Sequence, residues 1–409
     1  MFRLIPGRNR AAITNRPSRL RRLDARLEAK HSQQSLASRP PGHIYCGDWR
    51  YLISQRLLLL LWTILLTGGT IAQDSVSANG LRCGAQARGL LVGAAVAVQP
   101  LKNDVTYART LAREVNIVVA ENAMKFAQLH PTQTGYNFAD ADVIVDFANT
   151  YAMRVRGHTL VWHYQIPQWL INGNFPPGEI SAILKEHIQT VVGHYRGRIY
   201  AWDVVNEAIG DNSTLQETIW LKALGPDYIE QAFVWAREAD PQAKLFYNDS
   251  GGEALGPRSD AIYSLVRNLK ARGVPIDGIG LQSHFSIEQP PNFRDISANL
   301  NRLAALGLEI HVTELDVRLS MPPTKEKLRQ QATIYRNYLR ACLSTSKCRA
   351  FVMWGFTDKY SWIPSYFRGK GAALPLDEAY NPKPAYNALF DVLRARRDPC
   401  VRDMNGCCY

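Results

Sequence analysis

Short apolar runs alternate with longer segments of helical spacing from residue 89 onward. The runs span 90–96, 116–121, 155–162, 199–207, 244–249, 278–284, 309–316 and 351–358. The segments with helical spacing span 104–113, 140–152, 179–196, 216–239, 258–272, 293–306, 325–344 and 383–396. Nearly continuous apolar runs of this length are typical of parallel strands buried on both faces. Asp140 and Pro384 stand near two helix starts, where a cap and a first-turn proline are favoured.

Eight strand–helix units in about 320 residues predict an α/β fold, a single (β/α)8 TIM barrel, as one domain. The alternative is a doubly wound open sheet. It lacks the glycine-rich phosphate loop, because Gly89 and Gly93 do not form G-x-G-x-x-G after the first strand. No repeat or linker interrupts 89–398, and too little chain remains outside the barrel for a carbohydrate-binding module. The sequence therefore predicts one barrel domain over 73–398.

The barrel directs the search for function to the carboxyl ends of the strands, where the active sites of such folds lie. Carboxylates, amides, imidazoles and tryptophans end the predicted runs. They are Glu121, Asn122, Lys125, His158, Trp162, His163, Gln165, Asn206, Glu207, Asn248, Asp249, Gln282, His284, Glu314, Asp316, Trp354 and Asp358, with Trp362 in the loop beyond. Sugars present hydroxyl groups and apolar C–H faces, which such side chains bind well.

Among the glutamates of this set, Glu207 and Glu314 each end an apolar run about a hundred residues apart, and we expect them to face one cavity. One such glutamate alone is often only a solvated residue at a strand exit. A pair of carboxyl groups at strand ends is typical of enzymes that hydrolyse glycosidic bonds. Their reaction needs one protonated carboxyl group and one charged carboxylate. We expect His284 and Asp316 to hold Glu314 as a carboxylate, while repulsion between the two glutamates keeps Glu207 protonated. The amide of Asn206 is placed to bind the 2-hydroxyl of the sugar.

At these residues the sequence resembles glycoside hydrolase family ten, the barrel endo-β-1,4-xylanases. The matching segments are 121–125 (ENAMK), 157–163 (GHTLVWH), 202–207 (WDVVNE), 282–284 (QSH), 313–316 (TELD), 354–358 (WGFTD) and 380–386 (YNPKPAY). The resemblance covers roughly 85–395. It implies a retaining mechanism with Glu207 as acid/base and Glu314 as nucleophile. It also implies that the sugar subsites are lined by Glu121, Asn122, Lys125, His158, Trp162, Gln165, Gln282, Trp354 and Trp362.

Two positions depart from the family pattern: Phe126 stands where many relatives have Trp, and Ser250 where an aromatic residue is common. They put the fine subsite preference in doubt. One alternative is a related hydrolase of β-1,4-glucan, which the space beside Lys125 and Trp354 would distinguish. Another is a non-catalytic polysaccharide-binding protein, which the presence of both carboxylates disfavours. No cofactor or metal is expected, because Cys400, Cys407 and Cys408 lack nearby histidines.

A net charge of +12 would favour nucleic-acid binding only if the positive residues lay in the folded domain. Residues 1–56 carry nine of these charges, so the remainder of the chain is nearly neutral. The hypothesis of nucleic-acid binding therefore loses its main support. The expected partner is the polysaccharide substrate xylan, with no obligate protein partner, and the expected state is a monomer.

The N-terminal region has the composition of an export segment behind a basic extension. Residues 1–52 are rich in Arg, Ser, Gln and Pro and are predicted to be disordered. Arg56 precedes the apolar stretch 57–66, and 70–72 (TIA) follows as a small-residue exit. The apolar stretch is short for a membrane span, which needs roughly 20 residues. We therefore expect cleavage after Ala72 and a secreted or periplasmic enzyme, and retention of 1–72 as a membrane anchor is the alternative.

The cysteines agree with export, because six remain after removal of 1–72 and an even number suggests disulfides. Cys342 and Cys348 bracket a short turn and are the favoured pair, which the family resemblance also implies. In a closed barrel the first strand and last helix are neighbours. Cys83 is therefore expected to bond Cys400, Cys407 or Cys408, and the latter three belong to a Cys-rich tail, 399–409.

Overall fold

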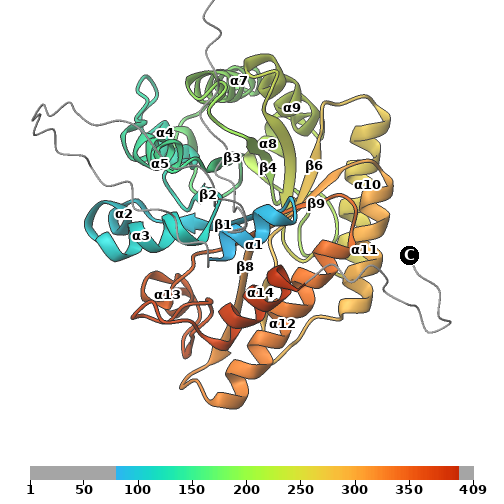
Figure 1. Cartoon of the computed structure of the whole chain (residues 1–409). Helices are drawn as coiled ribbons and strands as arrows, with labels where there is room; N and C mark the ends of the chain where they lie inside the picture. The colour runs from blue at the N-terminus through green and yellow to red at the C-terminus, as the bar shows by residue number, and fades with distance from the viewer. Residues whose placement is uncertain (1–79, 396–409) are drawn as a thin grey trace, which may run out of the picture. The chain divides into compact units, whose positions relative to one another are not determined.

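The strands of the chain form a closed ring with helices around it (Figure 1). We describe residues 80–395 from a computed structural model. The barrel strands are β1 (Leu91–Val96), β2 (Ile117–Ala120), β3 (Arg154–Val161), β4 (Ala201–Asn206), β5 (Lys244–Asp249), β6 (Gly278–Leu281), β8 (Glu309–Ser320) and β9 (Cys348–Met353). Neighbouring strands pair in parallel, and pairings of β9 with both β1 and β8 close the ring. The predicted (β/α)8 barrel is thus confirmed.

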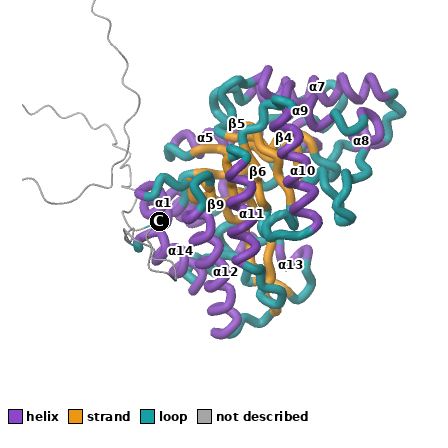
Figure 2. The backbone as a smooth tube through the Cα atoms, turned by 90° about the vertical axis from the view of Figure 1, so that its right-hand side faces the viewer, coloured by secondary structure: helices purple, strands orange, loops and turns teal. Residues whose placement is uncertain are grey.

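One long helix follows each strand and covers the outside of the ring. These helices are α3 (Val105–Glu114), α5 (Ala139–Thr150), α7 (Pro177–His194), α9 (Tyr228–Ala239), α10 (Pro257–Ala271), α11 (Phe293–Ala305), α12 (Lys325–Ser344) and α14 (Pro384–Arg394). Figure 2 shows α10, α11 and α12 side by side over the strands. Each helix turns an apolar face inward, as α12 does with Tyr335, Tyr338 and Leu339. Burial of these faces supplies the main driving force for folding.

Shorter elements occupy the connections. They are α1 (Leu81–Ala87), α2 (Val98–Asn103), α4 (Phe126–Leu129), α6 (Gln168–Ile171), α8 (Ile219–Leu224), α13 (Ile363–Tyr366), a 3-10 turn (Asp358–Tyr360), β7 (His284–Ser286) and β10 (Lys370–Gly371). β7 and β10 pair only with β8, whose carboxyl half extends beyond the ring. Glu314 and Asp316 therefore lie within a longer strand than predicted, although they still face the carboxyl end of the barrel.

Two sequence predictions about the helices are wrong in detail. The segment 216–239 is two helices, because Gly225 takes a left-handed backbone (φ 68°) after α8 and Pro226 follows it. Asp140 does not cap α5. The helix starts one residue earlier, the side chain of Asn137 accepts from the N–H of Ala139, and Asp140 pairs with Lys102 across 2.6 Å.

Glycines let large side chains enter the narrow barrel. A Cβ on Gly157 would lie 2.1 Å from the ring of Trp202 on the adjacent strand. A Cβ on Gly280 would lie 2.1 Å from Oδ1 of Asn248, its partner on the adjacent strand. Only glycine fits at these two positions, which therefore set how closely the strands approach beneath the site.

The barrel interior holds a buried charged pair. The Arg156 guanidinium donates two hydrogen bonds to the Asp203 carboxylate, and both side chains are almost wholly buried. Arg156 Nη1 also lies 2.7 Å from Nδ1 of His311. Burial lowers the pKa of His311 to about 4, so its imidazole is neutral and accepts this hydrogen bond. The pair is thus fully partnered, as a buried charge must be.

A disulfide joins Cys342 to Cys348, at the end of α12 and the start of β9, which confirms that predicted pairing. The predicted partners of Cys83, the Cys-rich tail, the basic extension and the export segment with its cleavage site lie outside the described residues. Within 80–395, no helix is long and apolar enough to cross a membrane.

Candidate active site

A cleft of about 520 Å³ opens at the carboxyl ends of the strands. Its lining unites residues from six barrel strands and the loops after them. They are Glu121, Asn122, Lys125, His158, Trp162, Tyr164, Gln165, Asn206, Glu207, Gln282, His284, Glu314, Trp354, Trp362 and Tyr366. Every subsite residue predicted from the sequence is in this set. Asp316 is not, because it is fully buried behind His284.

Glu314 is held by two side chains inside the cleft. Asn248 Nδ2 donates to its Oε1 over 2.8 Å, and His284 Nε2 lies 3.2 Å from its Oε2. Burial alone would raise the pKa of Glu314, but the hydrogen bond from His284 and the charges of the nearby histidines lower it below its ordinary value. Glu314 is therefore a stable carboxylate.

His284 bridges Glu314 and Asp316, whose Oδ2 lies 2.9 Å from its Nδ1. Burial opposes its charge, but the two carboxylates outweigh burial and raise the pKa of His284 to about 10. The imidazole thus remains a cation at neutral pH and donates at both nitrogens. Asp316 also accepts from the indole Nε1 of Trp362 over 2.8 Å, which fixes that ring at the edge of the cleft.

Glu207 has different partners. Trp162 Nε1 donates to its Oε2, and Gln282 Nε2 donates to its Oε1, each over 2.7 Å. Neither partner carries a charge, in contrast to the cationic His284 beside Glu314. The two glutamates therefore share one cleft but sit in chemically distinct surroundings, as an acid and a nucleophile require.

A row of amides separates the two glutamates. The Asn206 amide contacts the side-chain amides of Asn248 and Gln282 at 2.8 and 3.3 Å. Asn248 touches Glu314 and Gln282 touches Glu207, so the row reaches from one carboxylate to the other. Asn248 stands at a predicted strand end, but sequence reasoning did not include it in the site. Its position between two site residues becomes visible only when the strands are placed side by side.

The floor of the cleft is tied to the charged pair inside the barrel. His158 Nδ1 lies 3.0 Å from Asp203 Oδ2 and 4.0 Å from Glu314 Oε1. Asp203 is in turn bonded to Arg156. Burial raises the pKa of Asp203, but Arg156 and His158 more than compensate, so its pKa is below the ordinary value. Glu314 thus rests on an ordered chain of polar groups that reaches into the barrel core.

Lys125 brings a positive charge to the cleft. Its Nζ donates to Asn122 Oδ1 over 3.0 Å and lies 5.0 Å from the ring centre of Trp162. Burial lowers the pKa of Lys125, while Glu314 and the neighbouring carboxylates oppose that change. Glu121 is half-buried, and partial burial raises its pKa. This corner offers both donors and acceptors to hydroxyl groups.

Aromatic rings form the walls. Trp354 is buried, with its ring edge-on to His158 at 5.3 Å, whereas Trp162 and Trp362 are half-buried at the cleft edge. Sequence reasoning missed Tyr164 and Tyr366, which contact Trp162 and Trp362 at centroid distances of 5.2 and 5.0 Å. Both lie within two to four residues of a predicted site tryptophan, a signal that could have found them.

The two departures from the family pattern lie outside the cleft lining. Phe126 is buried on α4 and stacks on His187 with ring centres 3.6 Å apart. Ser250 lies beyond β5 and its hydroxyl accepts from Arg258. The expectation that these positions affect subsite preference therefore gains no support from a direct contact with the cleft.

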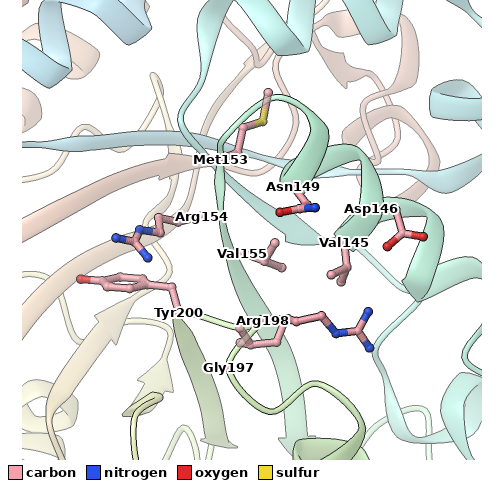
Figure 3. A pocket seen from close by; sticks show the side chains of 10 residues that line it. Val145, Asp146, Asn149, Met153, Arg154, Val155, Gly197, Arg198 and Tyr200 are labelled. Carbon is pink, nitrogen blue, oxygen red and sulfur yellow. The ribbon is translucent and has the colours of Figure 1, made fainter. Parts of the chain in front are cut away.

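A smaller hollow of about 280 Å³ lies at the opposite, amino end of β3 and β4 (Figure 3). Arg154 and Tyr200 lie on one side of it, and Asp146, from α5, on the other. Asp146 is the one carboxylate in its lining. Of these two hollows, the larger one contains the pair Glu207 and Glu314 at the carboxyl ends of the strands, so it is the candidate active site.

Comparison with known proteins identifies relatives among the glycoside hydrolases. The profile of the family described as "Glycosyl hydrolase family 10" matches residues 80–392. Endo-1,4-beta-xylanase B of Thermotoga neapolitana is 45% identical over 291 residues, 71% of this chain and 84% of that protein. An endo-1,4-beta-xylanase of Agaricus bisporus is 40% identical over 294 residues, 71% of this chain and 88% of that protein. The crystal structure of xylanase 10B from Thermotoga petrophila in complex with xylobiose superposes with a TM-score of 0.75. It is 43% identical in sequence, and the match covers 77% of this chain and 97% of that chain.

Proposed function

The chain belongs to glycosyl hydrolase family 10, and from this premise we propose how it hydrolyses xylan, with Glu314 as nucleophile and Glu207 as acid/base. The protein is an endo-1,4-β-xylanase. One observation carries the assignment of roles: the cation His284 contacts Glu314, whereas the neutral donors Trp162 and Gln282 contact Glu207. A cationic neighbour favours the charged form of a carboxyl group, which a nucleophile must have.

In the first step, Glu314 attacks the anomeric carbon of the bound xylose unit while Glu207 gives its proton to the departing glycosidic oxygen. The carbon–oxygen bond to the leaving sugar breaks, and a covalent glycosyl-enzyme forms on Glu314. In the second step, the Glu207 carboxylate takes a proton from water as that water attacks the same carbon. Glu314 leaves, and the sugar keeps its β configuration.

The remaining cleft residues would bind the chain and favour the transition state. Asn206 lies between the two glutamates, so its amide can bind the 2-hydroxyl of the sugar, a contact that strengthens as charge develops. Trp162, Trp354 and Trp362 offer ring faces to sugar C–H groups. Glu121, Asn122, Lys125, His158, Gln165 and Gln282 supply donors and acceptors to hydroxyl groups. All of these groups belong to the described part of one chain, so the proposed site needs no residue from a second chain.

The test is release of reducing ends by the full-length protein from xylan and, in parallel, from soluble cellulose. The two polymers differ by the hydroxymethyl group at C5, which must fit beside Lys125 and Trp354. We expect a strong preference for xylan. Equal rates on the two polymers would instead favour a broader β-1,4-glycanase, and binding without release would mark a non-catalytic protein.

We also propose that the enzyme is exported. The disulfide between Cys342 and Cys348 fits an oxidising compartment. In this proposal residues 1–72 are removed, 73–398 form the catalytic domain and 399–409 form a Cys-rich tail. N-terminal sequencing of the mature enzyme from the native host should find a first residue at or near Gln73. Enzyme recovered in membranes with Met1 intact would show that the segment is an anchor.

A further inference from the structure

Glu207 has a backbone conformation that few residues other than glycine adopt. Its φ is 56°, in the left-handed region, immediately after β4 ends at Asn206. The backbone of a residue with a side chain is strained in this region. The conformation persists only where surrounding contacts enforce it. The direction in which the Glu207 carboxyl points therefore depends on what holds the backbone of residues 207–209.

Strand β5 and its side chains hold this segment. The N–H groups of residues 207, 208 and 209 donate in turn to Asn248 O (2.9 Å), Tyr247 Oη (3.1 Å) and Asp249 Oδ2 (3.3 Å). The Tyr247 hydroxyl donates to the same Asp249 Oδ2. Tyr247 and Asp249 are fully buried, so these acceptors have no competing water. Three successive peptide groups are thus fixed from one side.

Arg258, from α10, closes the arrangement. Its Nη2 donates to Asp249 Oδ1 over 3.0 Å and to the carbonyl oxygen of Ile209 over 2.9 Å. Ile209 is consequently held at its N–H by Asp249 and at its C=O by Arg258. The other ion pair of the guanidinium, from Nη1 to Asp211 Oδ1, is with a fully exposed side chain. The buried contacts are the ones that constrain the chain next to Glu207.

Arg258 favours the charged form of Asp249. Burial raises the pKa of Asp249, and the hydrogen bond from Tyr247 and the charge of Arg258 limit that rise to about 7. Without the guanidinium, the carboxyl group would take up a proton more readily and would accept the Ile209 N–H less strongly. Loss of Arg258 thus weakens both connections to Ile209.

None of Tyr247, Asp249 and Arg258 lines the cleft, so none can touch the substrate directly. We propose that Arg258, together with Tyr247 and Asp249, positions the acid/base Glu207. The inference rests on the proposed function of Glu207 and assigns to these three residues the placement of its carboxyl group. A displaced carboxyl would slow both proton transfers, to the leaving oxygen in the first step and from water in the second.

The substitution Arg258→Ala tests the proposal, with Arg302→Ala as matched control. Arg302 is exposed to a similar extent (26% against 21%), pairs with Asp260 and does not contact residues 207–211. Each variant is assayed on xylan and on an aryl β-xylobioside whose leaving group needs little protonation. We expect Arg258→Ala to lose kcat/KM on xylan by on the order of tenfold more than on the aryl substrate.

Azide gives a second readout that simple destabilisation would not produce. It attacks the glycosyl-enzyme without a base, so it should raise the turnover of Arg258→Ala on the aryl substrate and leave Arg302→Ala unchanged. Tyr247→Phe, which removes only the hydroxyl group, should respond in the same sense as Arg258→Ala. Arg258→Lys, which keeps the charge, should recover part of the xylan activity.

Equal losses on the two substrates without an azide response would overturn the proposal. If Arg258→Ala does not fold, Arg258→Lys and Tyr247→Phe decide by the same two readouts. Glu207→Ala is assayed alongside them. If azide does not rescue that variant, the acid/base role itself is wrong. If azide rescues Glu207→Ala but none of the positioning variants, only the positioning role is wrong.

Discussion

The indole Nε1 of Trp162 donates a hydrogen bond to Oε2 of Glu207 over 2.7 Å. A tryptophan at the end of one strand thus orients the carboxyl group at the end of the next. The same ring lies 5.0 Å from Lys125 Nζ, so Trp162 belongs to the polar machinery as well as to the apolar wall.

Trp162→Phe keeps an aromatic face but removes the N–H donor. A typical hydrogen bond contributes about 0.5–1.5 kcal/mol, so kcat/KM on xylan should fall by about two- to tenfold. Trp169→Phe is the control, since Trp169 donates its indole N–H to the carbonyl of His130 outside the cleft. Equal kinetics of Trp162→Phe and wild type would show that the hydrogen bond does not assist catalysis.

Glu207→Ala should lose about 10²–10⁴-fold in kcat/KM on xylan, because general acid catalysis is removed. On an aryl xylobioside the intermediate should form and then decay slowly, which gives a burst of the phenol. Added azide should restore turnover and yield a β-glycosyl azide, which proton NMR identifies. Release of an α sugar by the wild-type enzyme would contradict the retaining mechanism.

Glu314→Ala should abolish turnover of both substrates, because no other group is placed to form the covalent intermediate. Mass spectrometry of wild-type enzyme trapped with a slow 2-fluoro glycoside should locate the sugar on Glu314. A β-glycosyl azide formed by Glu314→Ala would show that the roles of the two glutamates are reversed.

His284→Gln should move the acid limb of the pH profile. His284 lowers the pKa of Glu314 against the effect of burial, so its removal raises that pKa. Glu314 must be deprotonated to react, and activity is lost as pH falls through its pKa. The acid limb of kcat/KM should therefore shift to higher pH. His194→Gln, which removes a partly exposed imidazole paired with Asp142, should leave the limb in place.

Arg156→Ala should destabilise the barrel strongly. It leaves Asp203 buried without its cationic partner, and breaking a buried ion pair in this way costs about 3–5 kcal/mol. Urea denaturation measures the change in the free energy of unfolding. Arg329→Ala breaks an exposed pair with Glu326 and should cost no more than about 0.5 kcal/mol. Losses of similar size in the two variants would contradict the structural role of the buried pair.

The sequence by itself determined the fold class and most members of the cleft. Apolar runs alternating with helical segments specify parallel strands with crossover helices, and parallel strands present their carboxyl ends at one edge. Residues as distant in the chain as Glu121 and Trp362 could therefore be assigned to one site before any coordinates were known. Local signals were also sufficient for the Cys342–Cys348 pair, because only a short turn separates the two residues.

Tertiary structure alone decided which of these residues touch. The pattern of apolar and polar residues does not predict how far each strand is shifted relative to its neighbour in the barrel. That shift decides that Asn248 contacts Glu314 and that Trp162 contacts Glu207. The same pattern does not predict the left-handed backbone of Glu207 either. That conformation arises from contacts with β5 and α10 rather than from the residue type. A side chain's hydrogen bonds depend on neighbours that the chain brings together only when the ring closes.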